Sequence, residues 1–254
     1  MTRIIGIISG KGGVGKTTTV ANLGAALVEM GKNVLILDAN VTTPNLSLHL
    51  GIPFYPVTLH DVIKRKAPIE KAIYNHSSGL RVIPASLSAS EIKDIDLDKF
   101  ESILLGLLGK ADVIILDAAA GLGREAIAAI DACDEVIVVT NPEIPAVTDA
   151  LKTIKICEEK GSKVLGVVVN RYKAHRYGMT LKDVQEMLEV PIIATISEDS
   201  NIPKSISKKI PLVILHPSSR AAVEFQRLAE DISHEVRIAR RKKGLFKKLF
   251  FWME

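Results

Sequence analysis

Short apolar runs rich in β-branched residues alternate along the chain with segments whose apolar residues recur every three or four positions. Runs such as Val113–Leu116 and Val136–Val139 are apolar throughout, which is typical of parallel strands covered on both faces. Alternating strands and helices favour right-handed crossovers, so we expect an α/β fold with a doubly wound, mostly parallel sheet flanked by helices. The predicted strands are Arg3–Ile8, Asn33–Leu37, Leu80–Pro84, Asp112–Leu116, Glu135–Thr140, Lys163–Asn170 and Pro191–Ile196, and the predicted helices lie near residues 18–30, 98–109, 124–132, 145–160, 180–189 and 218–238.

A glycine-rich loop follows the first predicted strand. Residues 10–17 meet the phosphate-loop pattern G-x-x-x-x-G-K-[ST] through Gly10, Gly15, Lys16 and Thr17. Glycines let backbone N–H groups turn toward phosphate oxygens, and the helix that follows points its positive end at the anion. We expect Lys16 to reach the β- and γ-phosphates of a nucleotide and Thr17 to ligate Mg²⁺. Further contacts are expected from Gly12, Gly13, Val14, Gly15 and Thr18.

Two further predicted strands lead into an aspartate. Asp38 follows Leu35–Leu37, and Asp117 follows Val113–Leu116 in a Walker B pattern. The carboxyl ends of parallel strands meet at one edge of a sheet, where ligands bind in folds of this class. An aspartate at a strand end also commonly caps a turn, which is the alternative for each residue. We expect Asp117 to hold a Mg²⁺-bound water.

The run Lys11-Gly12-Gly13-Val14-Gly15-Lys16-Thr17-Thr18 resembles the deviant Walker A motif of the MinD/ParA ATPases, which belong to the SIMIBI class of P-loop NTPases. In that family the early lysine reaches across a dimer to the partner's nucleotide, and the resemblance implies this role for Lys11. A solvated surface lysine is the alternative. The resemblance also implies a homodimer formed with ATP and Mg²⁺.

The resemblance extends to the segments after the two aspartates. Residues 35–46 are similar to the family's switch I, in which an early aspartate follows an apolar strand, and this implies that Asp38 acts near Mg²⁺ or its waters. Residues 118–121 are similar to its switch II, which implies that Gly121 offers its N–H to the γ-phosphate. Asn40 stands where many relatives carry an aspartate that helps to activate the attacking water. An amide can orient water but cannot accept its proton as a carboxylate does. We therefore expect either slow ATP hydrolysis or a larger catalytic role for Asp38. The resemblance implies that the catalytic residues are Lys11, Lys16, Asp38 and Asn40.

The base-binding side is also suggested by resemblance. Asn170 ends an apolar strand and matches the family position that reads the adenine edge, with Arg171 beside it. Residues 196–199 lie where relatives have an Ile-Pro-Glu/Asp loop next to the base, but Ser197 replaces the usual proline. The mixed basic and aromatic residues 171–177 could bind nucleic acid or form a solvated loop.

Composition favours one large domain followed by a tail. The chain has 254 residues, a hydrophobic content of 47% and no Pro/Gly/Ser-rich linker, so we expect a P-loop ATPase domain over residues 1–238 and a separate tail over residues 239–254. No signal peptide and no apolar run of about 18 residues is apparent. Cys133 and Cys157 form no C-x-x-C motif, so we expect two reduced core residues in a cytoplasmic protein.

The tail combines positive charge with an apolar face. Seven arginines and lysines and no acids lie between residues 237 and 248, and they outnumber the chain's net charge of +4. Four of the eleven aromatic residues lie in the last nine positions. At helical spacing, an apolar arc of about 160° forms, a pattern typical of helices that lie in the headgroups of anionic membranes. The residues expected to contact the membrane are Leu245, Phe246, Lys247, Lys248, Leu249, Phe250 and Trp252.

The tail is also similar to the membrane-targeting sequence of the MinD branch of the family. A partner-binding helix and a C-terminal helix that folds onto its own domain are the alternatives.

Taken together, these features predict an ATPase that dimerises on ATP, binds the cytoplasmic face of the cell membrane and positions cell-division or other machinery through an unidentified protein partner. A ParA-like DNA-partition ATPase, or a positioner of a motility or chemosensory apparatus, is the alternative. The tail favours membrane, so nucleic acid is not the expected partner.

Overall fold

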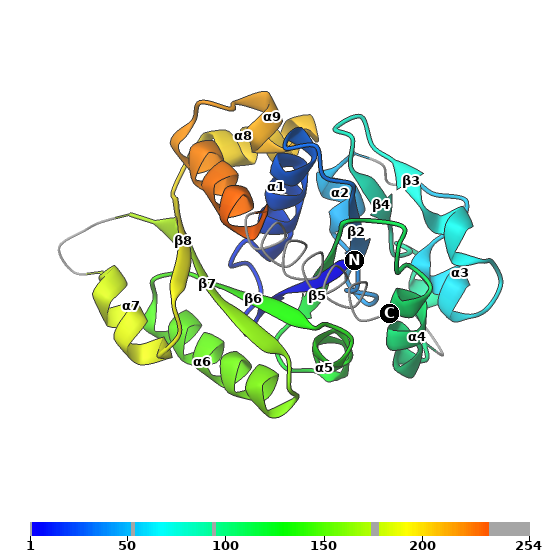
Figure 1. Ribbon diagram of the computed structural model, residues 1–254, viewed down its shortest axis with the longest axis horizontal. Helices are drawn as coiled ribbons and strands as arrows, with labels where there is room; N and C mark the ends of the chain where they lie inside the picture. Colours follow the sequence, from blue (N-terminus) through cyan, green and yellow to red (C-terminus); the bar gives the residue numbers. More distant parts are fainter. Residues whose placement is uncertain (1, 52–53, 93–94, 174–177, 234–254) are drawn as a thin grey trace, which may run out of the picture.

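An eight-stranded sheet with helices on both faces forms the body of the protein (Figure 1). The computed structural model describes residues 2–51, 54–92, 95–173 and 178–233. The strands lie in the order β3-β4-β2-β5-β1-β6-β7-β8, and every neighbouring pair is parallel except β3 with β4. Their bounds are β1 Arg3–Ser9, β2 Val34–Asp38, β3 Tyr74–Asn75, β4 Arg81–Ile83, β5 Val113–Ala120, β6 Glu135–Thr140, β7 Lys163–Tyr172 and β8 Ile192–Ser197.

Two apolar layers cover the sheet because alternate residues of each strand point to opposite faces. Ile5 and Ile7 of β1 pack with α1 and with the helical segment 220–233, whereas Ile4 and Ile8 pack with α4 and α5 on the other face. Figure 1 shows α1, α8 and α9 on one side of the sheet and α4 to α7 on the other. The helices are α1 Lys16–Glu29, α2 Leu46–His49, α3 Leu59–Ile63, α4 Phe100–Leu105, α5 Arg124–Asp131, α6 Ile144–Glu159, α7 Leu181–Leu188, α8 Asn201–Lys208 and α9 Leu212–Leu215.

The predicted fold class and all seven predicted strands are confirmed. The largest difference in length is in β5, which continues past Leu116 to Ala120 and pairs there with Ser9 at the end of β1. The predicted helix at 98–109 is shorter: a 3₁₀ turn over Leu97–Lys99 precedes α4, which ends before Gly106. Its apolar residues Phe100, Ile103, Leu104 and Leu107 are buried in the core, but Leu108 is exposed.

Several short elements escaped prediction. The antiparallel strand β3 and the helices α2, α3, α8 and α9 are at most eight residues long, and such lengths give too few turns for a clear apolar period. The predicted helix 218–238 is helical from 220 to 233, and its remainder lies outside the described residues. Within the described residues, no helix is both long and apolar enough to cross a bilayer.

Candidate nucleotide-binding site

The glycine-rich loop joins the central strand β1 to α1 at the carboxyl edge of the sheet. Gly13 and Gly15 have φ values of 81° and 97°, in the left-handed region that favours glycine. A side chain at Gly15 would also overlap the amide of Asn170. The sequence therefore folds into a loop whose backbone is free of side chains where it faces the cavity, as phosphate binding requires.

Lys16 and Thr17 begin α1 and meet Asp117 of β5. Lys16 Nζ donates to Asp117 Oδ1 at 2.6 Å, and Thr17 Oγ1 donates to Asp117 Oδ2 at 2.6 Å. Both charged side chains of this pair are buried, with exposed fractions of 9% and 1%. The structure thus brings together three residues that the sequence assigned to the phosphates and Mg²⁺.

Asp38 ends β2 beside them and is fully buried. Its carboxylate accepts the backbone N–H groups of Asn40 at 3.2 Å and Leu46 at 3.1 Å. Burial, followed by the nearby Asp117 carboxylate, raises the pKa of Asp38 to about 8, against the opposing effects of these hydrogen bonds and of Lys16. The position at a strand end is therefore as predicted, and the side chain also anchors the chain that follows it.

The chemistry of this donor set suits Mg²⁺. Two carboxylates and one hydroxyl supply the oxygen ligands that this cation prefers. Asp38 and Asp117 repel each other across the carboxyl ends of adjacent strands, and a divalent cation would relieve that repulsion.

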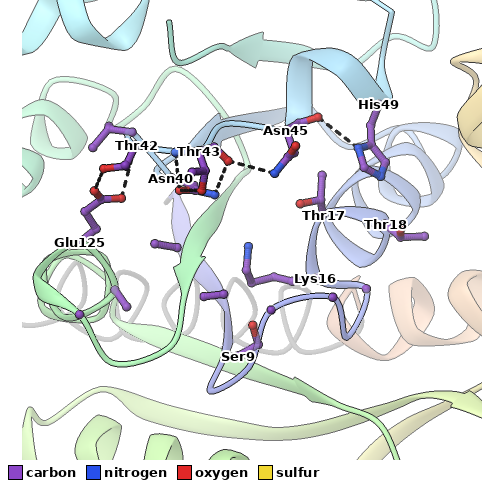
Figure 2. A pocket seen from close by; sticks show the side chains of 18 of the residues that line it. Ser9, Lys16, Thr17, Thr18, Asn40, Thr42, Thr43, Asn45, His49 and Glu125 are labelled. Carbon is purple, nitrogen blue, oxygen red and sulfur yellow. Dashed lines mark hydrogen bonds between the residues drawn. The ribbon is translucent and has the colours of Figure 1, made fainter. Parts of the chain in front are cut away.

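Asn40 is occupied in a turn. Its Nδ2 donates to Thr43 O at 2.6 Å, while its Oδ1 accepts from Thr43 N at 3.2 Å and from Thr43 Oγ1 at 3.1 Å. Figure 2 shows this turn across the cavity from Lys16. Asn40 lines the cavity as expected, but its amide also holds the shape of the 40–45 loop.

The same loop is tied to α5, a contact that sequence reasoning missed. Thr42 donates its hydroxyl to Glu125 Oε1, and its backbone N–H lies 3.4 Å from Glu125 Oε2 (Figure 2). Glu125 lies in the first turn of α5, directly after the predicted switch II segment. The sequence showed only that Glu125 lies at the start of a predicted helix, which does not identify Thr42 as its partner.

Gly121 follows β5 with a φ of 84°, and its N–H donates to Ser9 O at 2.9 Å. The predicted contact between this N–H and a γ-phosphate would require that bond to be exchanged. The bond exists because β5 runs four residues further than the sequence pattern indicated.

Lys11 lies on the surface of the loop. Its side chain is 47% exposed, and Nζ is 3.8 Å from Glu143 Oε2, a carboxylate that is itself 59% exposed. Exposed pairs at this distance contribute little to stability, so Lys11 keeps the freedom to exchange partners.

Asn170, which the resemblance assigned to the adenine edge, contacts the phosphate loop. It is buried, and its Nδ2 donates to Val14 O at 2.7 Å, so it braces the phosphate loop from β7. Its Oδ1 is buried without a hydrogen-bond partner, which leaves one acceptor for a base or another donor. Arg171 lines the cavity with a φ of 54°, a conformation rare for this residue type and common at functional sites.

Part of the phosphate loop lines a cavity of about 870 Å³. The predicted nucleotide-site residues that are not among its lining residues are Lys11, Val14, Asp38, Asp117, Gly121 and Asn170. The cavity lining includes predicted residues of the phosphate loop together with Asn40 and Arg171, and residues that the sequence did not indicate. The unpredicted lining residues include Thr42, Asn45, His49, Ile92, Ile95, Leu97, Arg124, Glu125 and Ile206. The predicted membrane-contacting residues, from Leu245 to Trp252, lie outside the described residues, as does the predicted domain boundary at 238.

Known proteins are similar along nearly the whole chain. A family model described as the CobQ/CobB/MinD/ParA nucleotide binding domain matches residues 5–212. An uncharacterized ATP-binding protein of Methanocaldococcus jannaschii is 38% identical over 251 residues, which cover 98% of this chain and 95% of that protein.

Solved structures agree with this match. The septum site-determining protein MinD complexed with Mg-ADP from Pyrococcus horikoshii is similar with a TM-score of 0.88 and 39% identity, covering 91% of this chain and 96% of that one. A chain of the MinC:MinD cell division protein complex of Aquifex aeolicus gives a TM-score of 0.82 at 29% identity, covering 91% and 96%. Because the family model covers most of the sequence and these relatives align along nearly all of it, the chain belongs to the MinD/ParA family of P-loop ATPases.

Proposed function

We propose that this protein is an ATPase that dimerises on ATP, binds an anionic membrane through its C-terminal tail and leaves the membrane after hydrolysis. The observation that carries the proposal is the meeting of Lys16, Thr17, Asp38 and Asp117 at the mouth of a glycine-rich loop. No other described cluster combines a buried cation, a hydroxyl and two buried carboxylates beside backbone shaped for phosphate.

The residues divide the work by position. Thr17, with Asp38 and Asp117, would hold Mg²⁺ or its waters, and the ion would neutralise charge on the transferring phosphoryl group. Lys16 would exchange its bond to Asp117 for the terminal phosphates. Asn40 and Asp38 would orient the attacking water, and the loose transition state of phosphoryl transfer depends more on such positioning than on a strong base. Asn170 and Arg171 would lie on the base side.

Dimerisation gives Lys11 its role. Among the described residues, the ion-pair partner of its exposed ammonium is Glu143 at 3.8 Å, a weak contact, so it can leave for the phosphates of a second copy. Each copy would thereby complete the other's site, and ATP would act as the link between them. The family's MinC:MinD complex supports a further protein partner, a regulator or cargo through which this chain positions cell-division or other machinery.

The tail supplies the membrane contact. Its basic residues favour anionic headgroups, and its apolar arc favours insertion beside them. A single short helix binds weakly, whereas two in a dimer bind with higher avidity, so membrane binding would follow the nucleotide state. We therefore expect the protein in the cytoplasm and, with ATP, on the inner face of the cell membrane.

A ParA-like role on DNA is the second candidate. Family membership favours it equally, because the family model covers both branches. The aromatic and apolar residues of the tail set the two apart, since DNA binding needs positive charge but no apolar arc.

Co-sedimentation with vesicles of anionic lipid, in ATP and in ADP, tests the proposal. Intact protein should pellet in ATP and less in ADP, and salt should weaken the binding because the charge attraction is screened. Deletion of Leu245–Glu254 should abolish pelleting. Phe250→Glu should do so too, whereas Phe251→Glu, outside the predicted apolar arc, is the matched control and should retain most binding.

Two outcomes would contradict the membrane role. The tail is not the anchor if the truncated protein pellets as well as the intact one. The DNA-partition candidate replaces this proposal if neither form pellets with vesicles and both retard non-specific DNA in ATP.

A further inference from the structure

One carboxylate from α5 accepts both donors of Thr42. Glu125 Oε1 accepts the Thr42 hydroxyl, and Glu125 Oε2 lies 3.4 Å from the Thr42 backbone N–H. Figure 2 shows the two side chains pointing toward each other, and both residues line the cavity. Hydrogen bonds to an ionised acceptor are stronger than neutral ones. The half-buried Glu125 can therefore hold the backbone at position 42 as well as its side chain.

The same peptide unit is held from its other side by the core. The carbonyl of Val41 belongs to the peptide that carries the Thr42 N–H, and it lies 3.0 Å from Nε2 of the fully buried His60. A peptide unit is planar, so its C=O and N–H point in opposite directions. The contact with His60 and the contact with Glu125 together fix the orientation of the 41–42 peptide.

This peptide lies inside the turn that Asn40 closes. The Asn40 amide donates to Thr43 O at 2.6 Å and accepts from Thr43 N at 3.2 Å, and the 41–42 peptide lies between the two residues. A rotation of that peptide would move Asn40 relative to Thr43 and turn the amide away from its place on the cavity wall. Phosphoryl transfer depends on the position of the attacking water, so the residue that fixes this peptide affects the reaction.

We propose that Glu125 is a positioning residue for ATP hydrolysis, whose carboxylate orients the 41–42 peptide and thereby holds Asn40 where it orients the attacking water. The inference rests on the proposed function and deepens it. It assigns control of the water to the first turn of α5, which follows Gly121 in the chain.

Hydrogen exchange in the nucleotide-free protein tests the hold on the loop. Glu125→Ala should raise the exchange rate of the amides of residues 40–46 about three- to tenfold, the usual effect of losing one hydrogen bond. Thr42→Val removes only the hydroxyl donor and should raise it by less. Asp131→Ala is the matched control, because it removes a carboxylate of the same helix, paired with Lys160 at 3.1 Å, and should leave this exchange unchanged.

Steady-state phosphate release tests the effect on the reaction. Glu125→Ala should lower kcat about three- to tenfold and leave KM for ATP within about twofold, because the phosphate loop keeps its contacts. In an Asn40→Ala background the same substitution should lower kcat no further, since Glu125 acts through Asn40. A purely structural role would lower kcat equally in both backgrounds. Asp131→Ala should leave kcat and KM at the wild-type values.

Three results would overturn the proposal: unchanged exchange over residues 40–46 in Glu125→Ala, unchanged kcat, or an equal loss of kcat with and without Asn40. If Glu125→Ala does not fold, Thr42→Val decides by the same measurements. Wild-type protein that binds ATP but releases no phosphate would instead refute the proposed ATPase function, and the exchange measurement would still judge the hold of Glu125 on the loop.

Discussion

At the scale of single residues, Asn40 closes a turn and, in the proposed function, orients the attacking water. An amide suits the first task, and a carboxylate suits the second. The Asn40 amide closes the turn to Thr43 with both a donor and an acceptor, which a carboxylate cannot do. A carboxylate would lose the bond to Thr43 O, turn more freely to the cavity and accept a proton from water. Asn40→Asp should therefore raise ATP turnover at saturating ATP, by up to the ~10²-fold typical of a positioned base.

Steady-state phosphate release measures this change. Asn40→Ala is the control, because it breaks the same turn without adding a carboxylate and should not raise turnover. Unchanged or slower turnover in a folded Asn40→Asp protein would show that the site does not use a base at this position.

His60 is a second residue whose state affects the 40–45 loop. It is fully buried, its Nε2 lies 3.0 Å from Val41 O, and its Nδ1 lies 3.0 Å from Ser86 N. The neutral ring satisfies both contacts if Nε2 carries the proton. Burial lowers the pKa of His60, so the unfolded chain takes up this proton at a higher pH than the folded chain. Its stabilising contribution is complete above the unfolded pKa of about 6.5 and is lost as the pH falls through the lowered folded pKa.

This predicts how a His60→Gln variant compares with wild type. The difference in free energy of unfolding between the two proteins should shrink as the pH falls from 7.5 to 5.5, because only wild type loses the histidine contribution. Other titrating groups, including Asp38 and His76, are common to both proteins and cancel. Urea unfolding at several pH values measures the difference, and a constant value across this range would contradict the assigned protonation.

The sequence predicted the site residues that lie at the ends of strands and in the phosphate loop. It did not predict the contacts between loops around them. Lys16, Thr17 and Asp117 could be assigned from the sequence because a phosphate loop and an acid after an apolar strand have fixed places in this fold. The hydrogen bond between Thr42 and Glu125 could not be predicted, because it joins residues 83 positions apart and depends on how two loops lie against each other. The hydrogen bond from Asn170 Nδ2 to Val14 O could not be predicted for the same reason.

At the scale of elements, the phosphate loop depends on the close approach of α6. A Cβ added at Gly10 would lie 2.7 Å from Thr153 Oγ1 and closer still to the carbonyl of Asp149, both in α6. Backbone atoms cannot move away without shifting the helix. Gly10→Ala should therefore destabilise the protein by about 1–3 kcal/mol, the usual cost of overpacking.

Gly12→Ala is the matched control in the same loop. A Cβ there meets nothing closer than Ala120 Cβ at 3.9 Å, so the free energy of unfolding should change by no more than about 0.5 kcal/mol. Urea unfolding of the two variants gives the comparison. Equal stability of Gly10→Ala and wild type would show that the loop is not held against α6 as described.

Long elements followed from the sequence pattern, and short ones did not. The strands of the parallel sheet and the helices α1 and α6 are long or wholly apolar, so their periods are clear. The extension of β5 beyond Leu116 consists of Asp117 and three alanines. Alanine favours helix over strand, so pairing with β1, and not local preference, decides this conformation. The helices α2 and α9 are single turns, stabilised by burial of Leu46, Leu212 and Val213 in the core rather than by local preference.

At the scale of the whole molecule, the proposed active form is an assembly of two chains. Gly12, Gly13 and Gly15 of the phosphate loop line the cavity, whereas Lys11 is half exposed and lies 3.8 Å from Glu143. The spacing of Lys11 and Lys16 predicts a resemblance to dimerising ATPases. The spacing alone does not show that Lys11 acts on a second copy of the chain. Nucleotide, dimer and membrane are linked in this account, so the dimer is the step on which the others depend.

The mass of the protein in solution, measured by light scattering after size exclusion with Mg²⁺ and ATP or ADP, tests that step most directly. Wild type should double its mass of 27.6 kDa in ATP and stay monomeric in ADP. Lys11→Ala should bind ATP yet remain monomeric, while Lys152→Ala, which removes an exposed lysine on α6, should dimerise like wild type. A Lys11→Ala protein that dimerises in ATP as readily as wild type, or a wild type that stays monomeric with ATP bound, would contradict the account.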